Sequence, residues 1–149
     1  MKVRTALLSV LAALLFSIPA MGQEGARVGV DASADCFLGP GGLPPVSGGL
    51  GIRARYGRPD QLVNAVAGLR YIYGTRLSGF QVPLLLNLNL LRAEAFSLYV
   101  GGGFEFDFIG RYWGCMKLQT GVAAGPHMDI RVFYKPYQGD LGVGFTYYF

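Results

Sequence analysis

Several ionisable side chains are spaced so that they could do chemistry together. Glu105 and Asp107 lie two residues apart, as paired carboxylates for acid–base catalysis would, but no nucleophile with an adjacent base accompanies them. His127, the only histidine, lies in the turn-like stretch AAGPHMD, which fits a Ser-His hydrolase poorly. The two carboxylates are better explained as ion-pair partners of arginines elsewhere in the sequence. We therefore predict no catalytic residue, no cofactor and no metal site.

A larger set of charges shares one parity within alternating polar and apolar stretches. If that parity faces the inside of a narrow barrel, its near-balanced charges should form an ion-pair network that plugs the interior. The alternative is a gated path for small ions. The set comprises Arg27, Asp31, Asp35, Arg53, Arg55, Arg70, Glu105, Asp107, Lys117, Asp129 and Arg131.

Cys36 and Cys115 are the two cysteines, one near the end of the first alternating stretch and one at the start of the sixth. In an exported chain two cysteines can form a disulfide. First and sixth strands are not neighbours in an eight-stranded barrel, so a bridge would require loops to fold over its mouth. A disulfide and two free thiols both stay open on the sequence alone.

Eight segments alternate with a period of two residues and are separated by links rich in Gly, Pro, Asp and Arg. This even number, at about 9–11 residues per segment, is typical of membrane-spanning antiparallel strands. The predicted strands are 27–37, 48–56, 63–74, 80–90, 96–108, 116–122, 128–134 and 141–149.

The two parities of these segments differ sharply in composition. One parity is apolar and carries no charge, as in Leu84, Leu86 and Phe104, whereas the other holds all the charges above and many glycines. A charge facing lipid at mid-depth costs about 2–4 kcal/mol, which would exclude it from an outward face. In the alternative, a soluble barrel or sandwich, the apolar parity would face inward. The polar parity is too rich in glycine to form a good water-facing surface.

Composition narrows the class of protein further. Of 149 residues, enough for one domain, 52% are hydrophobic and only 15% are charged. After residue 23 no apolar run reaches the roughly 18 residues that a membrane helix needs, so a closed β-barrel is the remaining membrane architecture. The formal net charge of +4 comes without a basic run interleaved with aromatics, so no nucleic-acid partner is expected.

The first residues have the pattern of a secretory signal peptide. Lys2 and Arg4 precede an apolar core, and Ala20-Met21-Gly22 offers small residues for cleavage. An uncleaved membrane helix is the alternative, but the apolar core is short for spanning. We predict a signal peptide over residues 1–22 and a barrel domain over residues 23–149.

The last segment alternates apolar residues and ends on an aromatic one. It resembles the C-terminal signal by which the outer-membrane assembly machinery recognises barrel proteins. The residues concerned are Leu141, Val143, Phe145, Tyr147 and Phe149.

A second stretch, FQVPLLLNLNLLRAEAFSLYVGGGFEFDF, resembles the PorT-type outer-membrane β-barrel family common in Bacteroidota. The matching residues are Val82–Leu86 and Tyr99–Gly103, whereas Asn87 stands where that family commonly has Lys. The resemblance implies an eight-stranded barrel in the outer membrane, and it does not imply an enzyme.

Together these features predict an all-β protein, an eight-stranded antiparallel up-and-down barrel in the cell outer membrane. Its expected partners are outer-membrane lipid and, during biogenesis, the barrel assembly machinery. We expect a structural or interaction role. A narrow channel or transport-associated barrel is the first alternative, and a lipid-modifying enzyme is the second.

Overall fold

The structure, a computed structural model, describes residues 25–39, 45–58, 60–74, 78–93, 95–108 and 114–149. The predicted signal peptide, residues 1–22, lies outside these ranges. No helix among the described residues is long and apolar enough to cross a membrane. The strands are β1 (Ala26–Phe37), β2 (Val46–Tyr56), β3 (Val63–Gly74), β4 (Gly79–Arg92), β5 (Phe96–Asp107), β6 (Cys115–Ala124), β7 (Met128–Lys135) and β8 (Asp140–Tyr148).

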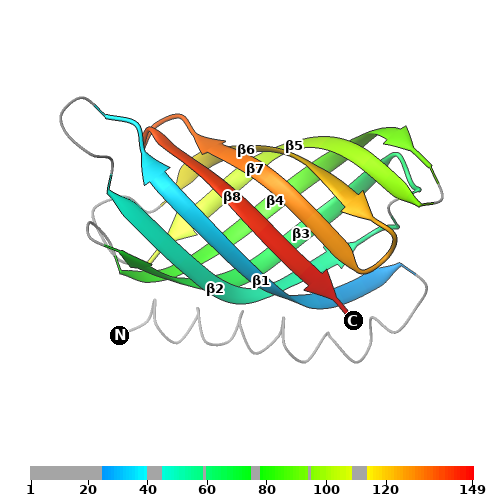
Figure 1. The fold of residues 1–149 in the computed structure, drawn as a ribbon, viewed down its shortest axis with the longest axis horizontal. Coiled ribbons are helices and arrows are strands. Elements are labelled where there is room, and N and C mark those ends of the chain that lie inside the picture. Colours follow the sequence, from blue (N-terminus) through cyan, green and yellow to red (C-terminus); the bar gives the residue numbers. More distant parts are fainter. Residues whose placement is uncertain (1–24, 40–44, 59, 75–77, 94, 109–113) are drawn as a thin grey trace.

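These eight strands form one closed barrel in which each strand pairs antiparallel with its neighbours in the chain. Figure 1 shows the strands crossing the molecule obliquely, with β1 and β8 side by side. The predicted all-β, eight-stranded up-and-down barrel is therefore confirmed. Every predicted strand boundary lies within two residues of the observed one.

Closure depends on the pairing of β8 with β1. Their register runs from Gly29 opposite Tyr148 to Phe37 opposite Asp140. Beyond the ladder, the Phe149 N–H donates to the Val28 carbonyl at 2.9 Å. No strand edge is left unpaired along this seam, and an unpaired edge would be a template for aggregation.

The two ends of the barrel differ in their connections. We call the end that holds the β1–β2, β3–β4, β5–β6 and β7–β8 links the loop end. The opposite end, where β1 begins and β8 finishes, is the terminal end; Figure 1 marks the C-terminus there. Gly139 and Gly125, at the β7–β8 and β6–β7 turns, have φ of 68° and 58°, a region that glycine enters without steric cost.

Side chains alternate between the two faces along each strand, because successive residues of a strand point to opposite sides. In β6 and β7 buried and exposed residues follow one another almost without interruption. One irregularity occurs in β4, where the register with β5 shifts between Asn89 and Leu91. Leu90 and Leu91 are consequently both exposed.

Candidate functional site

The inside of the barrel, here called the lumen, collects most of the charged residues singled out in the sequence. Arg27 and Asp107, near opposite ends of the barrel, are only half-buried. The other nine have exposed fractions of 6% or less: Asp31, Asp35, Arg53, Arg55, Arg70, Glu105, Lys117, Asp129 and Arg131. The lumen is therefore the place where these groups can act on one another.

Toward the loop end, the lumen charges are centred on Glu105, which is fully buried. Its carboxylate accepts from Lys117 Nζ at 2.7 Å and lies 2.8 Å from Lys135 Nζ and 3.1 Å from Arg70 Nη2. Asp35 lies 3.1 Å from Lys135 Nζ and 3.5 Å from Arg70 Nη2. These five groups come from β1, β3, β5, β6 and β7, so the cluster ties opposite walls together.

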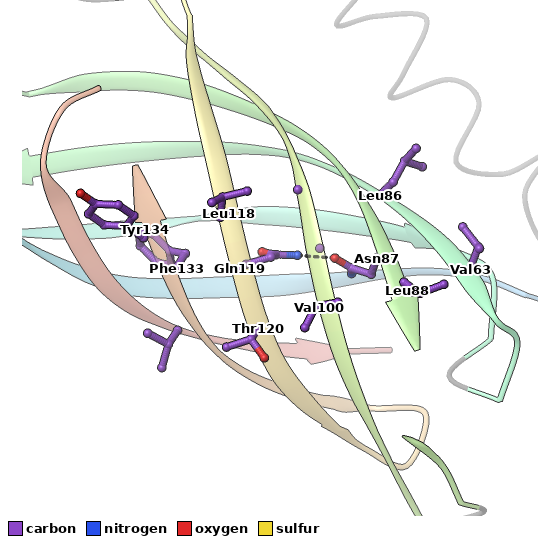
Figure 2. Close-up of a pocket in the computed structure, with 13 residues that line it drawn as sticks. Val63, Leu86, Asn87, Leu88, Val100, Leu118, Gln119, Thr120, Phe133 and Tyr134 are labelled. Atoms are coloured by element: carbon purple, nitrogen blue, oxygen red, sulfur yellow. Dashed lines mark hydrogen bonds between the residues drawn. The ribbon is translucent and has the colours of Figure 1, made fainter. Parts of the chain in front are cut away.

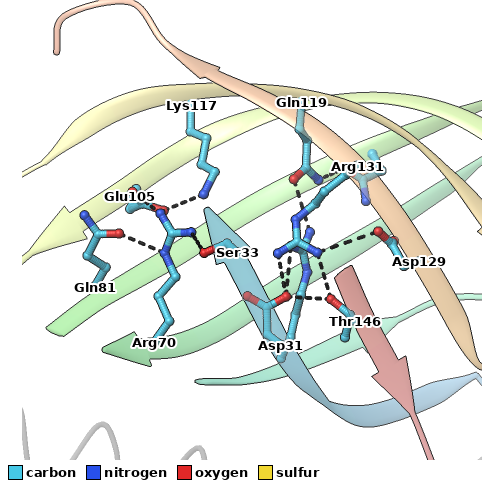
Figure 3. Close-up of polar contacts among 12 residues, drawn as sticks. Asp31, Ser33, Arg70, Gln81, Glu105, Lys117, Gln119, Asp129, Arg131 and Thr146 are labelled. Atoms are coloured by element: carbon cyan, nitrogen blue, oxygen red, sulfur yellow. Dashed lines mark hydrogen bonds and ion pairs between the residues drawn. The ribbon is translucent and has the colours of Figure 1, made fainter. Parts of the chain in front are cut away.

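Arg70 also illustrates how fully this cluster is hydrogen-bonded. Its Nε donates to Gln81 Oε1 at 2.8 Å, and its Nη1 donates to Ser33 Oγ at 2.9 Å. Figure 3 shows the guanidinium between Glu105, Gln81 and Ser33. A planar guanidinium can make several such bonds at once, which makes it a better centre for a buried network than an ammonium.

Toward the terminal end, a second cluster forms around Asp31. Its carboxylate accepts from Arg131 Nη2 and from Thr146 Oγ1, the latter at 2.6 Å, and Arg53 Nη1 lies 4.0 Å away. Arg131 Nη1 in turn donates to Thr146 Oγ1 at 2.8 Å. Figure 3 shows Asp31, Arg131 and Thr146 meeting inside the barrel.

Asp129 completes this second cluster through a tyrosine. The Tyr99 hydroxyl donates to the Asp129 carboxylate, with distances of 2.9 and 3.1 Å to its two oxygens. Arg131 Nη1 lies 3.8 Å from the same carboxylate. Asp129 is thus held by a neutral donor as well as by a cation.

Amide side chains link the charged groups to β3 and β4. Asn87 Nδ2 donates to Asn64 Oδ1 at 2.9 Å, and Gln119 Nε2 donates to Asn87 Oδ1 at 2.6 Å. Arg53 Nη2 donates to Gln119 Oε1 at 3.2 Å. This chain of amides crosses the lumen from β3 to β6, and its last member, Gln119, accepts a hydrogen bond from an arginine on β2.

Glycines on the inner face make room for the long side chains. A Cβ atom at Gly144 would lie 2.6 Å from Arg131 Nη2, and one at Gly142 would lie 2.6 Å from Phe133 Cε2. Both distances are too short for a real contact, so a side chain there would displace the arginine or the ring. Small residues and long charged ones are therefore complementary parts of one packed interior.

Several residues of the lumen were not singled out from the sequence, among them Lys135, Tyr99, Phe133 and Tyr148. Lys135 lies just beyond the predicted strand 128–134, yet it ends β7 and is 1% exposed. Tyr99, Phe133 and Tyr148 have the inward parity but were not included in the network. The Phe133 ring lies between cations, with Lys117 Nζ 4.0 Å from its centroid. Parity alone could have placed all four inside.

The carboxylate pair and the histidine lie apart from one another in the structure. Glu105 is held by three cations, whereas Asp107 accepts from Gln81 and, at 2.8 Å, from Gln138 Nε2. His127 lies at the terminal end, where its Nδ1 is 2.8 Å from the Tyr148 carbonyl oxygen. Within the described ranges, no three His, Cys, Asp or Glu residues group as metal ligands.

The disulfide considered between Cys36 and Cys115 is not formed, and both cysteines are free thiols. Cys36 pairs with Val46 and Leu141, which face outward, whereas Cys115 pairs with the buried Glu105. Their side chains therefore point to opposite faces of the barrel wall. Their strands, β1 and β6, are also not neighbours.

The outer wall contrasts with the lumen. Leu84, Leu86 and Phe104 have exposed fractions of 45%, 62% and 61%. Across β3 to β7 this wall has a shallow depression of about 770 Å³, lined mainly by aliphatic side chains around Gly102. Figure 2 shows the hydrogen bond between Asn87 and Gln119, and it shows the Leu86 and Leu118 side chains pointing away from this bond.

The C-terminal strand repeats this outward pattern. Its apolar residues have exposed fractions between 37% and 71%. They are Leu141, Val143, Phe145, Tyr147 and Phe149.

A scan against protein-family models and a search of curated proteins both gave no match to this chain.

Proposed function

We propose that this chain is a small integral outer-membrane β-barrel protein whose lumen is plugged by charged side chains. In this proposal residues 1–22 are a cleaved signal peptide, and residues 23–149 insert into the outer membrane. The barrel serves as a structural or interaction component rather than as a catalyst. One observation carries the proposal: the outward face of the strands is apolar, and the charged groups of the same strands face the lumen.

The direction of this polarity favours lipid over water as the surrounding medium. In the described strands no outward position between the two rims carries an ionised side chain. A soluble barrel would instead bury its Leu and Phe residues and expose its Arg and Asp residues. A transmembrane barrel has the opposite arrangement, with an apolar band outside and a polar interior.

Two sequence features support the outer membrane as the location. The predicted signal peptide would direct export, and the alternating C-terminal strand that ends on Phe149 resembles a recognition signal for the assembly machinery. The resemblance to the PorT-type family agrees with this proposal. Outer-membrane lipid and that machinery are the partners it requires.

A plugged lumen favours a structural or interaction role over conduction. Side chains from strands that are not neighbours contact each other across the lumen, as Arg53 on β2 does with Gln119 on β6 and Asp35 on β1 with Lys135 on β7. An eight-stranded barrel is only wide enough to be filled by its side chains. We therefore propose that the resting barrel does not conduct ions.

The test combines location with conductance. The full chain should fractionate with outer membranes after expression in a Gram-negative host, and its detergent-folded form should migrate differently before and after boiling. Protein found free in the periplasm, with mobility that boiling never changes, would reject the membrane proposal.

In planar bilayers the folded protein should be silent, and Glu105→Ala should introduce measurable conductance. Arg58→Ala is the matched control, since Arg58 is exposed and pairs with Asp60 outside the lumen. Steady single-channel currents from the unaltered protein would instead support the channel alternative.

A further inference from the structure

The buried charges of the lumen do not balance. Among the described residues, ten Asp, Glu, Lys and Arg side chains in the lumen are buried, and six of them are basic. The basic ones are Arg53, Arg55, Arg70, Lys117, Arg131 and Lys135. The four acidic ones are Asp31, Asp35, Glu105 and Asp129. An uncompensated charge in a low-dielectric interior is costly, so the location of the surplus matters.

At the loop end the imbalance is compensated locally. Arg70, Lys117 and Lys135 face the buried carboxylates of Asp35 and Glu105. The half-buried Asp107 adds a third carboxylate nearby, within hydrogen-bonding distance of Gln81 and Gln138. Three cations thus meet three anions at this end.

At the terminal end a cation is left over, and it is Arg55. Arg53 and Arg131 each have a carboxylate oxygen within 4.0 Å. Arg55 is the one buried lumen cation for which the described residues supply no carboxylate at that distance. The positive surplus can therefore be assigned to one side chain.

The geometry of Arg55 places this surplus across the terminal mouth of the lumen. The side chain starts on β2, and its Nη2 donates to the carbonyl of Pro126, in the β6–β7 turn, at 2.9 Å. Its guanidinium carbon lies 4.4 Å from the centroid of the Tyr148 ring. The remaining donors, Nε and Nη1, are buried and have no hydrogen-bond partner among the described residues.

Further unpartnered groups lie on the inner wall toward the terminal end. They are Arg53 Nε, Arg131 Nε, Ser97 Oγ and the Tyr148 hydroxyl, all on side chains with exposed fractions of 2% or less. Arg53 and Tyr148 pair with the same residue of β1, Gly29, from its two sides. Each of these groups can donate a hydrogen bond, and the guanidinium nitrogens cannot accept one.

We propose that the terminal end of the lumen is a binding site for a single small inorganic anion of the halide class, held mainly by Arg55. A guanidinium does not lose its proton in proteins, so the surplus charge cannot be removed by deprotonation. A water molecule would satisfy the free donors but would leave the charge uncompensated. An anion does both, and the close packing of Arg55 on Tyr148 favours a monatomic ion over a larger oxyanion.

This inference rests on the geometry of the lumen and does not depend on the membrane proposal. The test uses the full folded chain, crystallised with bromide as the only halide, because bromide gives an anomalous X-ray signal. The expected result is an anomalous peak within about 3.5 Å of Arg55 Nε or Nη1, a hydrogen-bond distance lengthened for a larger acceptor. A non-anomalous water peak at that position, or bromide only on the exterior, would overturn the proposal.

Two variants make the assignment specific. Arg55→Gln should lose the bromide peak. Arg58→Gln changes an exposed arginine three residues further along the chain and should keep the peak. In solution, replacing gluconate by chloride should raise the thermal midpoint of the Arg58→Gln protein and leave that of Arg55→Gln unchanged. If Arg55→Gln does not fold, Tyr148→Phe serves instead and should weaken halide binding severalfold. A chloride effect that persists in the Arg55→Gln protein, or one that is undiminished in the Tyr148→Phe protein, would contradict the site.

Discussion

The two faces of each strand make the most informative comparison in this molecule. Along β7, Arg131 is 1% exposed, whereas its neighbours Ile130 and Val132 have exposed fractions of 59% and 45%. Adjacent residues thus occupy opposite environments, because a strand turns successive side chains to opposite sides. The polar interior and the apolar exterior of the barrel therefore come from one alternating pattern, and each face can be tested separately.

The inner face should show the largest response to a single substitution. Glu105→Ala removes the carboxylate shared by Arg70, Lys117 and Lys135 and leaves buried cations without a partner. Breaking a buried pair in this way costs about 3–5 kcal/mol of unfolding free energy. Denaturant unfolding of the folded barrel measures this loss of unfolding free energy.

Asp60→Ala is the control for that experiment, because Asp60 pairs with Arg58 on the surface and should contribute less than about 1 kcal/mol. Equal small losses at both positions would mean that the lumen network is hydrated rather than packed.

On the outer face, Val132→Arg should cost about 2–4 kcal/mol in a lipid bilayer, since it places a charge against acyl chains. The measurement is unfolding from lipid vesicles. Tyr137→Arg, at the 83% exposed position in the β7–β8 turn, should cost only about 0–1 kcal/mol. A Val132→Arg protein as stable as the Tyr137→Arg protein would indicate that the wall faces water.

A smaller effect is expected from one hydroxyl of the lumen. Tyr99→Phe keeps the ring but removes the donor to Asp129, and hydrogen bonds to charged groups contribute about 1.5–3 kcal/mol. Tyr134→Phe changes an outward tyrosine in the same way and should alter stability by less than about 0.5 kcal/mol. Thermal or denaturant unfolding of the two variants, side by side, measures the difference between the faces.

The smallest effect should come from Cys36. Because Cys36 and Cys115 point to opposite faces, Cys36→Ser should change the unfolding free energy by less than about 0.5 kcal/mol, with or without reductant. A bridged pair would lose about 2–5 kcal/mol on the same substitution. Unfolding under non-reducing conditions decides between the two.

The fold was predictable because it depends on a strictly local signal. Alternation with period two gives both the strands and the face of each side chain, and the turn residues give the boundaries. The same alternation places Cys36 on the outward face with Ala34 and Cys115 on the inward face with Lys117. Applied to both cysteines, parity would have excluded the disulfide.

The partners within the lumen could not be predicted in the same way. Parity assigns a face but not a depth, and the depth at which Glu105 meets Lys117 or Lys135 is fixed by the stagger of all eight strands. Lys135 was also not predicted to lie in the lumen, because the Lys-Pro dipeptide at residues 135–136 is typical of the start of a link between strands. The shift in β4 between Asn89 and Leu91 left no signal in the alternating pattern.

The most direct test of the central claim, that the apolar face contacts acyl chains, uses one tryptophan as a probe. In a Trp113→Phe background, Phe104→Trp places the probe on the outer wall, and Tyr137→Trp places it at the loop end. Lipids brominated along the acyl chain quench tryptophan fluorescence on contact. We expect strong quenching of Phe104→Trp and weak quenching of Tyr137→Trp. Equal, weak quenching of both probes would contradict contact between the apolar face and acyl chains.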